Sequence, residues 1–234
     1  VALSTVTSAV SIGTGSLSLN GSLLVDAALN ASARATADAE STGAGTAAVG
    51  FGLALAIGQH SAAATLKRNV TAGGDVTFSA TGVSNVSATG KASAAGAPAE
   101  TTADTTPQAP GGPTGVDKKA ADQRSFADQL AADNQLQGSG NATAPSAGTS
   151  DGPVSVAAAI GIAISTLTVR TAIAGTVSRI QAGGTVALAS AANADTASAA
   201  DGSATGGTAA IGAGVAVSVS RMTNEAIVPA GGLT

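Results

Sequence analysis

The sequence GTAAVGFGLALAIGQHSAAATL, residues 45–66, decides the fold because the chain uses it again. Residues 207–228 read GTAAIGAGVAVSVSRMTNEAIV and align without a gap, placing Leu55 on Val217. A third version, VSVAAAIGIAISTLTVRTAI, occupies residues 154–173. Each copy alternates apolar and small residues and is enriched in Val, Ile and Thr, which is typical of a β-strand with one buried face. The chain is therefore predicted to repeat a long strand.

The alternation changes phase at the same place in all three copies. In the first copy the odd-numbered Leu53 and Ile57 are followed by the even-numbered Ala62 and Leu66. An extra residue that exchanges the buried face is typical of a β-bulge or a strand corner. We therefore expect Leu53 and Ile57 to point inward, followed by a corner and then by an inward Leu66. The alignment also places His60, at this corner, on Leu167 and Met222.

The segments between these strands repeat as well. Each combines a Gly turn, a short apolar strand and an alternating Ala/Ser/Thr/Asp tract, and is predicted to form the second strand of its unit. One unit then spans about 50 residues, except the second, which carries an insertion. The predicted units are residues 20–71, 72–181 and 182–229.

The insertion, residues 97–152, differs in composition from the repeats on either side, residues 1–96 and 153–234. Its flanks are rich in Pro, Thr, Gly and Ser, as flexible loops are. Between them, residues 117–136 place Phe126 and Leu130 at helical spacing and predict one amphipathic α-helix. That helix could cover the strand array, dock a neighbouring molecule or decorate the surface.

The predicted fold class is all-β, a repetitive β-solenoid with one inserted α-helix. Stacked units bury a continuous core that no single unit could bury alone. Hydrophobic residues make up 44% of the chain but aromatic residues only 1%, so the core must consist of thin layers packed closely. A parallel β-helix-like winding, a flattened solenoid and an antiparallel stack all fit this pattern.

The phrases AGGTVALASAANADTASAADG, residues 182–202, and GGTAAIGAGVAVSVSRMTNEA, residues 206–226, resemble known repeats. They are similar to the Ala/Gly/Val-rich tandem repeats of giant bacterial cell-surface proteins of the adhesin-like or filamentous β-solenoid class. The resemblance covers the chain outside the insertion. It implies an extracellular or cell-surface location and a structural or adhesive role. A calcium-binding nonapeptide and a regular Thr-x-Thr ladder are both missing from the sequence.

The composition argues against catalysis. Net charge is −4 and Cys is absent, which disfavours nucleic acid as a partner and excludes thiolate chemistry. His60 is the single histidine and is expected to be structural, while Asp38 and Glu40 are expected on one solvated strand face, like Asp195 and Asp201. No catalytic, cofactor-binding or metal-binding residues are predicted, and no apolar run is long enough to span a membrane.

The predicted partners are copies of this chain or adjacent repeats of one polypeptide. The closing AGGLT repeats the start of a unit, and joining Thr234 to Val1 gives AGGLTVALSTVTSA, which resembles AGGDVTFSATGVSN at residues 72–85. Both ends are therefore expected to be stacking surfaces, and Phe126 and Leu130 are further candidate contacts. The alternative function is a binding module for a glycan, a surface or a protein. Glycosylation is a weaker hypothesis, resting on the Asn-x-Ser/Thr sequences at Asn20, Asn30, Asn69, Asn85 and Asn141.

Overall fold

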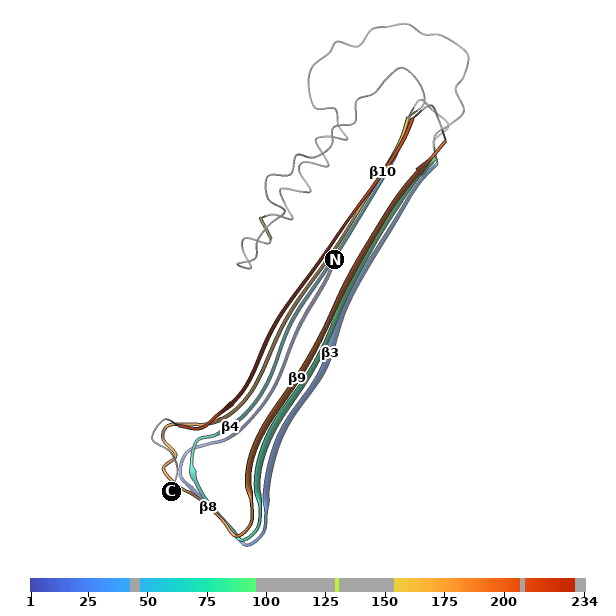
Figure 1. The fold of residues 1–234 in the computed structure, drawn as a ribbon. Coiled ribbons are helices and arrows are strands. Elements are labelled where there is room, and N and C mark those ends of the chain that lie inside the picture. Colours follow the sequence, from blue (N-terminus) through green and yellow to red (C-terminus); the bar gives the residue numbers. More distant parts are fainter. Residues whose placement is uncertain (43–46, 96–128, 131–153, 207–208, 230–234) are drawn as a thin grey trace, which may run out of the picture.

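The computed structural model describes residues 1–42, 47–95, 129–130, 154–206 and 209–229, and almost all of them lie in β-strands (Figure 1). Six strands are long and face one another, a shorter first strand joins one of their sheets, and three short strands lie at one end. The strands are β1 (Ala2–Ile12), β2 (Ser16–Leu19), β3 (Leu23–Thr42), β4 (Ala47–Leu66), β5 (Asn69–Ala72), β6 (Val76–Ala95), β7 (Val154–Ile173), β8 (Ile180–Ala182), β9 (Val186–Thr205) and β10 (Ala209–Ile227).

These strands form three parallel sheets. Sheet A has the order β1-β4-β7-β10, sheet B has β2-β5-β8, and sheet C has β3-β6-β9. Every pairing between the described strands is parallel. The chain passes through sheets A, B and C and then returns to sheet A one strand further along, which is the winding of a β-solenoid. The predicted stacked all-β fold is confirmed, and of the alternatives that the sequence left open the strands adopt the parallel one, so the antiparallel alternative is wrong.

Sheets A and C face each other and their separation changes along the strands. They diverge toward the end where β8 and the rest of sheet B close the gap (Figure 1). At this wide end the core contains Phe78, Leu66 and Leu167, all fully buried. At the opposite, narrow end the core cluster consists of alanines alone, namely Ala48, Ala92, Ala94, Ala157 and Ala159. The interior therefore tapers from bulky to minimal side chains.

Toward the narrow end, the backbones of sheets A and C lie directly against each other. A Cβ placed on Gly161 of β7 would collide with the carbonyl oxygen of Ala199 on β9, and the carbonyl oxygen of Ala88 on β6 would lie 3.3 Å away. Gly161 therefore faces two strands of sheet C at once. Only glycine leaves room for the two sheets to approach this closely, and the scarcity of aromatic residues follows from the same closeness.

The predicted change of inward face is wrong. β4 is one uninterrupted strand whose residues pair one to one with β7 from Ala47 to Leu66. Ala54, Ala56 and Leu66 all point inward, whereas Leu53 and Ile57 lie on the outer face. The sequence pattern changes because the gap widens: only small residues fit inside near the narrow end, and bulky ones fit inside at the wide end.

Four further expectations concern the shorter segments of the chain. The short strand and the small-residue tract of each unit form a single 20-residue strand, as in β6. β1 pairs with the second half of β4 in sheet A, so its predicted likeness to the strand that begins near residue 75 in sheet C is wrong. The helix predicted for residues 117–136 lies outside the described residues except for Gln129 and Leu130, which are helical. The predicted division at residues 97 and 152 also falls outside them.

Candidate interaction surfaces

One line of side chains through the core shows how the stack is exposed at its ends. Val6, His60, Leu167 and Met222 are successive register partners on β1, β4, β7 and β10. His60 is 3% exposed and Leu167 is 0% exposed, but Val6 is 39% exposed and Met222 is 53% exposed. The alignment of His60 with Leu167 and Met222 is thus confirmed. The core is sealed in its middle and open at both edges of the sheet.

The edge strand β10 also exposes polar side chains at positions that face the interior of the stack. Ser218 and Asn224 occupy inward positions of β10, in register with the buried Ala163 and Val169 of β7. Within the described chain, β10 pairs on one side only, as do β9, β1 and β3. A parallel strand paired on one side presents unpaired backbone donors and acceptors along its other side. The two edges are therefore surfaces on which another rung can pair.

The outer face of sheet A carries a second surface. Nine aliphatic side chains form three rows across β4, β7 and β10, and we call them the outer ridge. Over β4 and β7 the ridge is covered in part by Leu130, and Leu55, Ile162 and Ile164 are each 5% exposed. Over β10 it is open, with Val215 52% exposed and Val217 41% exposed. The outer ridge consists of Leu53, Leu55, Ile57, Ile160, Ile162, Ile164, Val215, Val217 and Val219.

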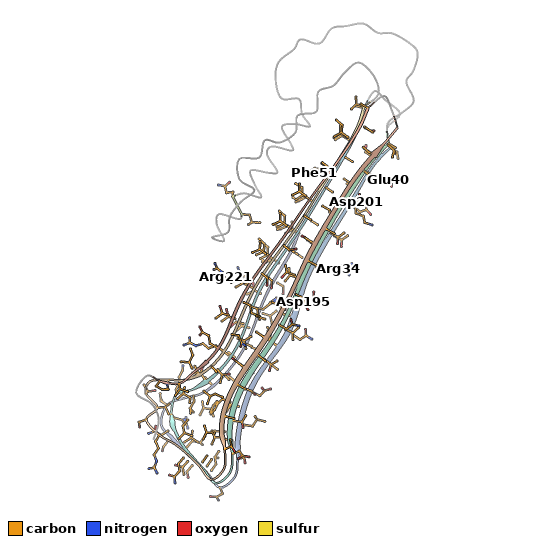
Figure 2. The ribbon with its side chains drawn as sticks, viewed as in Figure 1. Arg34, Glu40, Phe51, Asp195, Asp201 and Arg221 are labelled. Atoms are coloured by element: carbon orange, nitrogen blue, oxygen red, sulfur yellow. The ribbon has the colours of Figure 1, made fainter. Side chains whose placement is uncertain are left out.

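Sequence reasoning missed the outer ridge because it assigned these residues to the interior. The signal was available: the bulky odd positions of residues 47–57 recur in every copy and are larger than the residues between them. Phe51 lies on this same outer side of the sheet (Figure 2). Of the other predicted contacts, Val1 is 87% exposed at the N-terminal edge, whereas Phe126 and Thr234 lie outside the described residues.

The outer face of sheet C is polar. Lys91 on β6 is in register with Asp38 on β3 and with Asp201 on β9, so a cation stands between two carboxylates. Arg34 and Asp195 project from the same face (Figure 2). The predicted placement of Asp38 and Glu40 on one solvated face is confirmed, since both are exposed. In the described residues no group of three His, Asp or Glu side chains could hold a metal ion.

His60 lies in the interior of an unbroken strand rather than at a corner. Its Nδ1 lies 2.7 Å from Ser84 Oγ, and its Nε2 lies 3.1 Å from Ser4 Oγ. Burial lowers the pKa of the imidazole below its usual value. A buried ring with both nitrogens bonded to hydroxyls, away from substrate-accessible surface, has the surroundings of a structural residue.

The Asn-x-Ser/Thr sequences differ in their surroundings. Asn69 Oδ1 accepts hydrogen bonds from the backbone N–H of Ser178 at 2.9 Å and of Arg179 at 3.1 Å. Its amide thus fixes the segment between β7 and β8. Asn30 and Asn85 instead lie exposed on the outer face of sheet C. Glycosylation of Asn69 would take place on its Nδ2, which donates to Ser178 Oγ at 3.3 Å, whereas the Nδ2 atoms of Asn30 and Asn85 lie on an exposed face, which makes these two the better acceptors.

Comparisons with known proteins found no match among family models, curated proteins or solved structures. The described part of the chain contains no helix long and apolar enough to cross a membrane.

Proposed function

We propose that this chain is a structural repeat module of a long extracellular or cell-surface fibre or adhesin. In this function the chain stacks end to end with further repeats or with further copies of itself. The observation that carries the proposal is the exposure of Met222, whose register partner Leu167 is completely buried one strand away. A further rung on β9 and β10 would bury Met222 as β10 buries Leu167.

The same rung would satisfy the edge strands. A parallel neighbour on β10 would pair the backbone groups that this strand leaves open, and apolar burial would add about 25 cal/mol for each Å² covered. The narrow interior supports the proposal because a stack of thin rungs gains core only by becoming longer. The sequence likeness to surface-protein repeats supports the extracellular location.

Sedimentation velocity tests the stacking. We expect the protein without substitutions to form larger assemblies as its concentration rises. Met222→Lys places a charge at the open end of the core and should keep the protein as single molecules, since an inward charge on an edge strand opposes pairing. Thr223→Lys, the matched control, adds the same charge to the outer face of β10 and should assemble as the natural chain does.

A protein that stays monomeric over the whole concentration range would contradict stacking between copies. The mass of the native polypeptide under denaturing conditions then decides between the two forms of the proposal. A mass far above 21.6 kDa identifies repeats of one long chain. A mass near that value, together with no assembly, rejects both forms.

The outer ridge favours a second function, the binding of a glycan, a surface or a protein partner on sheet A. Val215 and Val217 are more exposed than large aliphatic residues usually are, and exposed apolar patches mark interaction sites. Val217→Lys separates the two functions, because it places a charge on the outer ridge and leaves the inward Met222 unchanged. Loss of binding with an intact fold and unchanged assembly supports the binding module, whereas unchanged binding argues against it.

A further inference from the structure

A chain of hydrogen bonds crosses the core between neighbouring rungs. Ser4 on β1, His60 on β4, Ser84 on β6 and Ser165 on β7 are joined in that order. The distances are 3.1 Å from Ser4 Oγ to His60 Nε2, 2.7 Å from His60 Nδ1 to Ser84 Oγ and 2.9 Å from Ser84 Oγ to Ser165 Oγ. This chain links four strands and both long sheets.

The chain lies between two apolar clusters, with Leu66 and Phe78 on its wide side and Ala56 and Val86 on its narrow side. Ser84 and Ser165 are completely buried. Gly58 makes the room: a Cβ there would lie 2.6 Å from Val86 Cγ2 and 2.9 Å from His60 Cε1. The ring thus occupies a space that the neighbouring residues leave free.

No charged side chain faces the ring. The strands that pack around His60 are β1, β3, β6 and β7, and the inward positions of their described residues hold only Ala, Gly, Val, Leu, Ile, Phe, Ser and Thr. The charged residues of these strands occupy outward positions on β3, β6 and β7, and the exposed amine of Val1 precedes β1. They are Asp26, Arg34, Asp38 and Glu40 on β3, Lys91 on β6 and Arg170 on β7.

We propose that His60 and its three serine partners form a proton-sensitive joint in the core, which holds the rungs together when the ring is neutral and loosens them when the ring is protonated. A neutral imidazole offers one donor and one acceptor, which matches two hydroxyl neighbours. A protonated imidazole donates from both nitrogens. Ser84 can then accept from the ring and donate to Ser165, so the hydrogen bonds persist.

The charge, however, has no counter-charge. An unpaired buried cation costs far more than a neutral ring in the same place. Burial accordingly lowers the pKa of His60 in the folded protein. The unfolded chain, with a histidine pKa of about 6.5, binds the proton more readily than the folded protein does. The stability contributed by neutral His60 is therefore fully present above about pH 6.5. That contribution is lost as the pH falls from there toward the lower pKa of the folded state.

The repeats themselves supply the control variants. Leu167 and Met222 occupy the position of His60 in the following rungs, and Ala31 and Ala194 occupy that of Ser84 in the adjacent strands. The variant H60L/S84A therefore replaces the joint with side chains that the fold already accepts there. It removes the buried titratable group and leaves every outer-face carboxylate in place.

The first experiment measures urea unfolding midpoints of untagged protein between pH 8 and pH 4.5. Relative to H60L/S84A, the natural chain should lose up to about tenfold in its folded-to-unfolded ratio for each pH unit below about 6.5. Parallel pH profiles for the two proteins would overturn the proposal. The outer carboxylates titrate in both proteins, so the difference between them reports His60.

The second experiment needs no variant and covers the case in which H60L/S84A does not fold. Since His60 is the single histidine, its ring gives one set of NMR signals. We expect those signals to keep their neutral-form shifts in the folded protein at pH 6, where a free histidine is mostly protonated. A ring that titrates at or above pH 6.5 in the folded protein would overturn the proposal.

Discussion

Gly161 of β7 and Ala199 of β9 meet so closely that a single β-carbon on Gly161 would collide with the Ala199 carbonyl oxygen. The contact joins sheet A to sheet C at backbone level. It shows that the distance between the two sheets depends on glycines, which have no side chain, as much as on the side chains that fill the core.

Gly161→Ala should therefore destabilise the protein by about 1–3 kcal/mol, the usual cost of overpacking a core. Urea unfolding measures the change. The control is Gly175→Ala, because no atom lies within 4 Å of a Cβ built at Gly175. Its effect should stay within about 0.5 kcal/mol. Equal effects of the two variants would argue against the close approach of the sheets.

The wide end should respond to the loss of volume instead. Phe78 is completely buried there, and Phe78→Ala should cost about 3–5 kcal/mol because it leaves a cavity. Phe51→Ala on the outer face of sheet A removes the same side chain and should cost much less. Calorimetry or urea unfolding of the two variants measures the difference, and a larger loss for Phe51→Ala would contradict the assignment of inner and outer faces.

We expect Asn69 to stabilise the segment between β7 and β8 through its side-chain amide. Asn69→Ala leaves the N–H groups of Ser178 and Arg179 without their acceptor, at a cost of about 1 kcal/mol. Hydrogen exchange should accelerate at those two amides while the amides of β7 remain protected. Asn193→Ala, on the exposed outer face of β9, is the control and should leave both amides unchanged.

The charges on sheet C predict a dependence on salt. Lys91→Glu would place three carboxylates side by side, at Asp38, position 91 and Asp201. We expect a loss of about 1 kcal/mol at low ionic strength, since like charges in direct register repel. The loss should shrink in 0.5 M salt because exposed charges are screened. A loss that does not change with salt would assign the effect to packing rather than to charge.

Much of the fold could be predicted because repeats carry strong information. The alignment of His60 with Leu167 and Met222 in the sequence is the register of β4, β7 and β10 in the structure. The glycine pairs at 73–74 and 183–184 lie between sheets B and C, where turns were expected. Stacking and the solvated face around Asp38 followed from composition and alternation, whereas the parallel direction of pairing, which alternation does not encode, comes from the structure alone.

The inner face of β4 could not be predicted in the same way. Alternation separates two faces but does not say which one lies inside. Leu53 and Ile57 are the bulkier residues and were assigned to the core, yet the opposite sheet lies too close to admit them. That closeness depends on Gly90 and Gly202, which lie on other strands. The deciding information is therefore tertiary and belongs to two sheets together.

The taper of the interior has one more consequence, which concerns registration. If the interior between sheets A and C had a constant width, a rung could shift by two residues along its neighbour and still place the same face toward the core. Here such a slide would carry the bulky residues of the wide end into spaces sized for alanine and glycine. The wedge-shaped interior therefore fixes the register of each rung on the next, so that the strands of a growing stack keep one alignment and one direction.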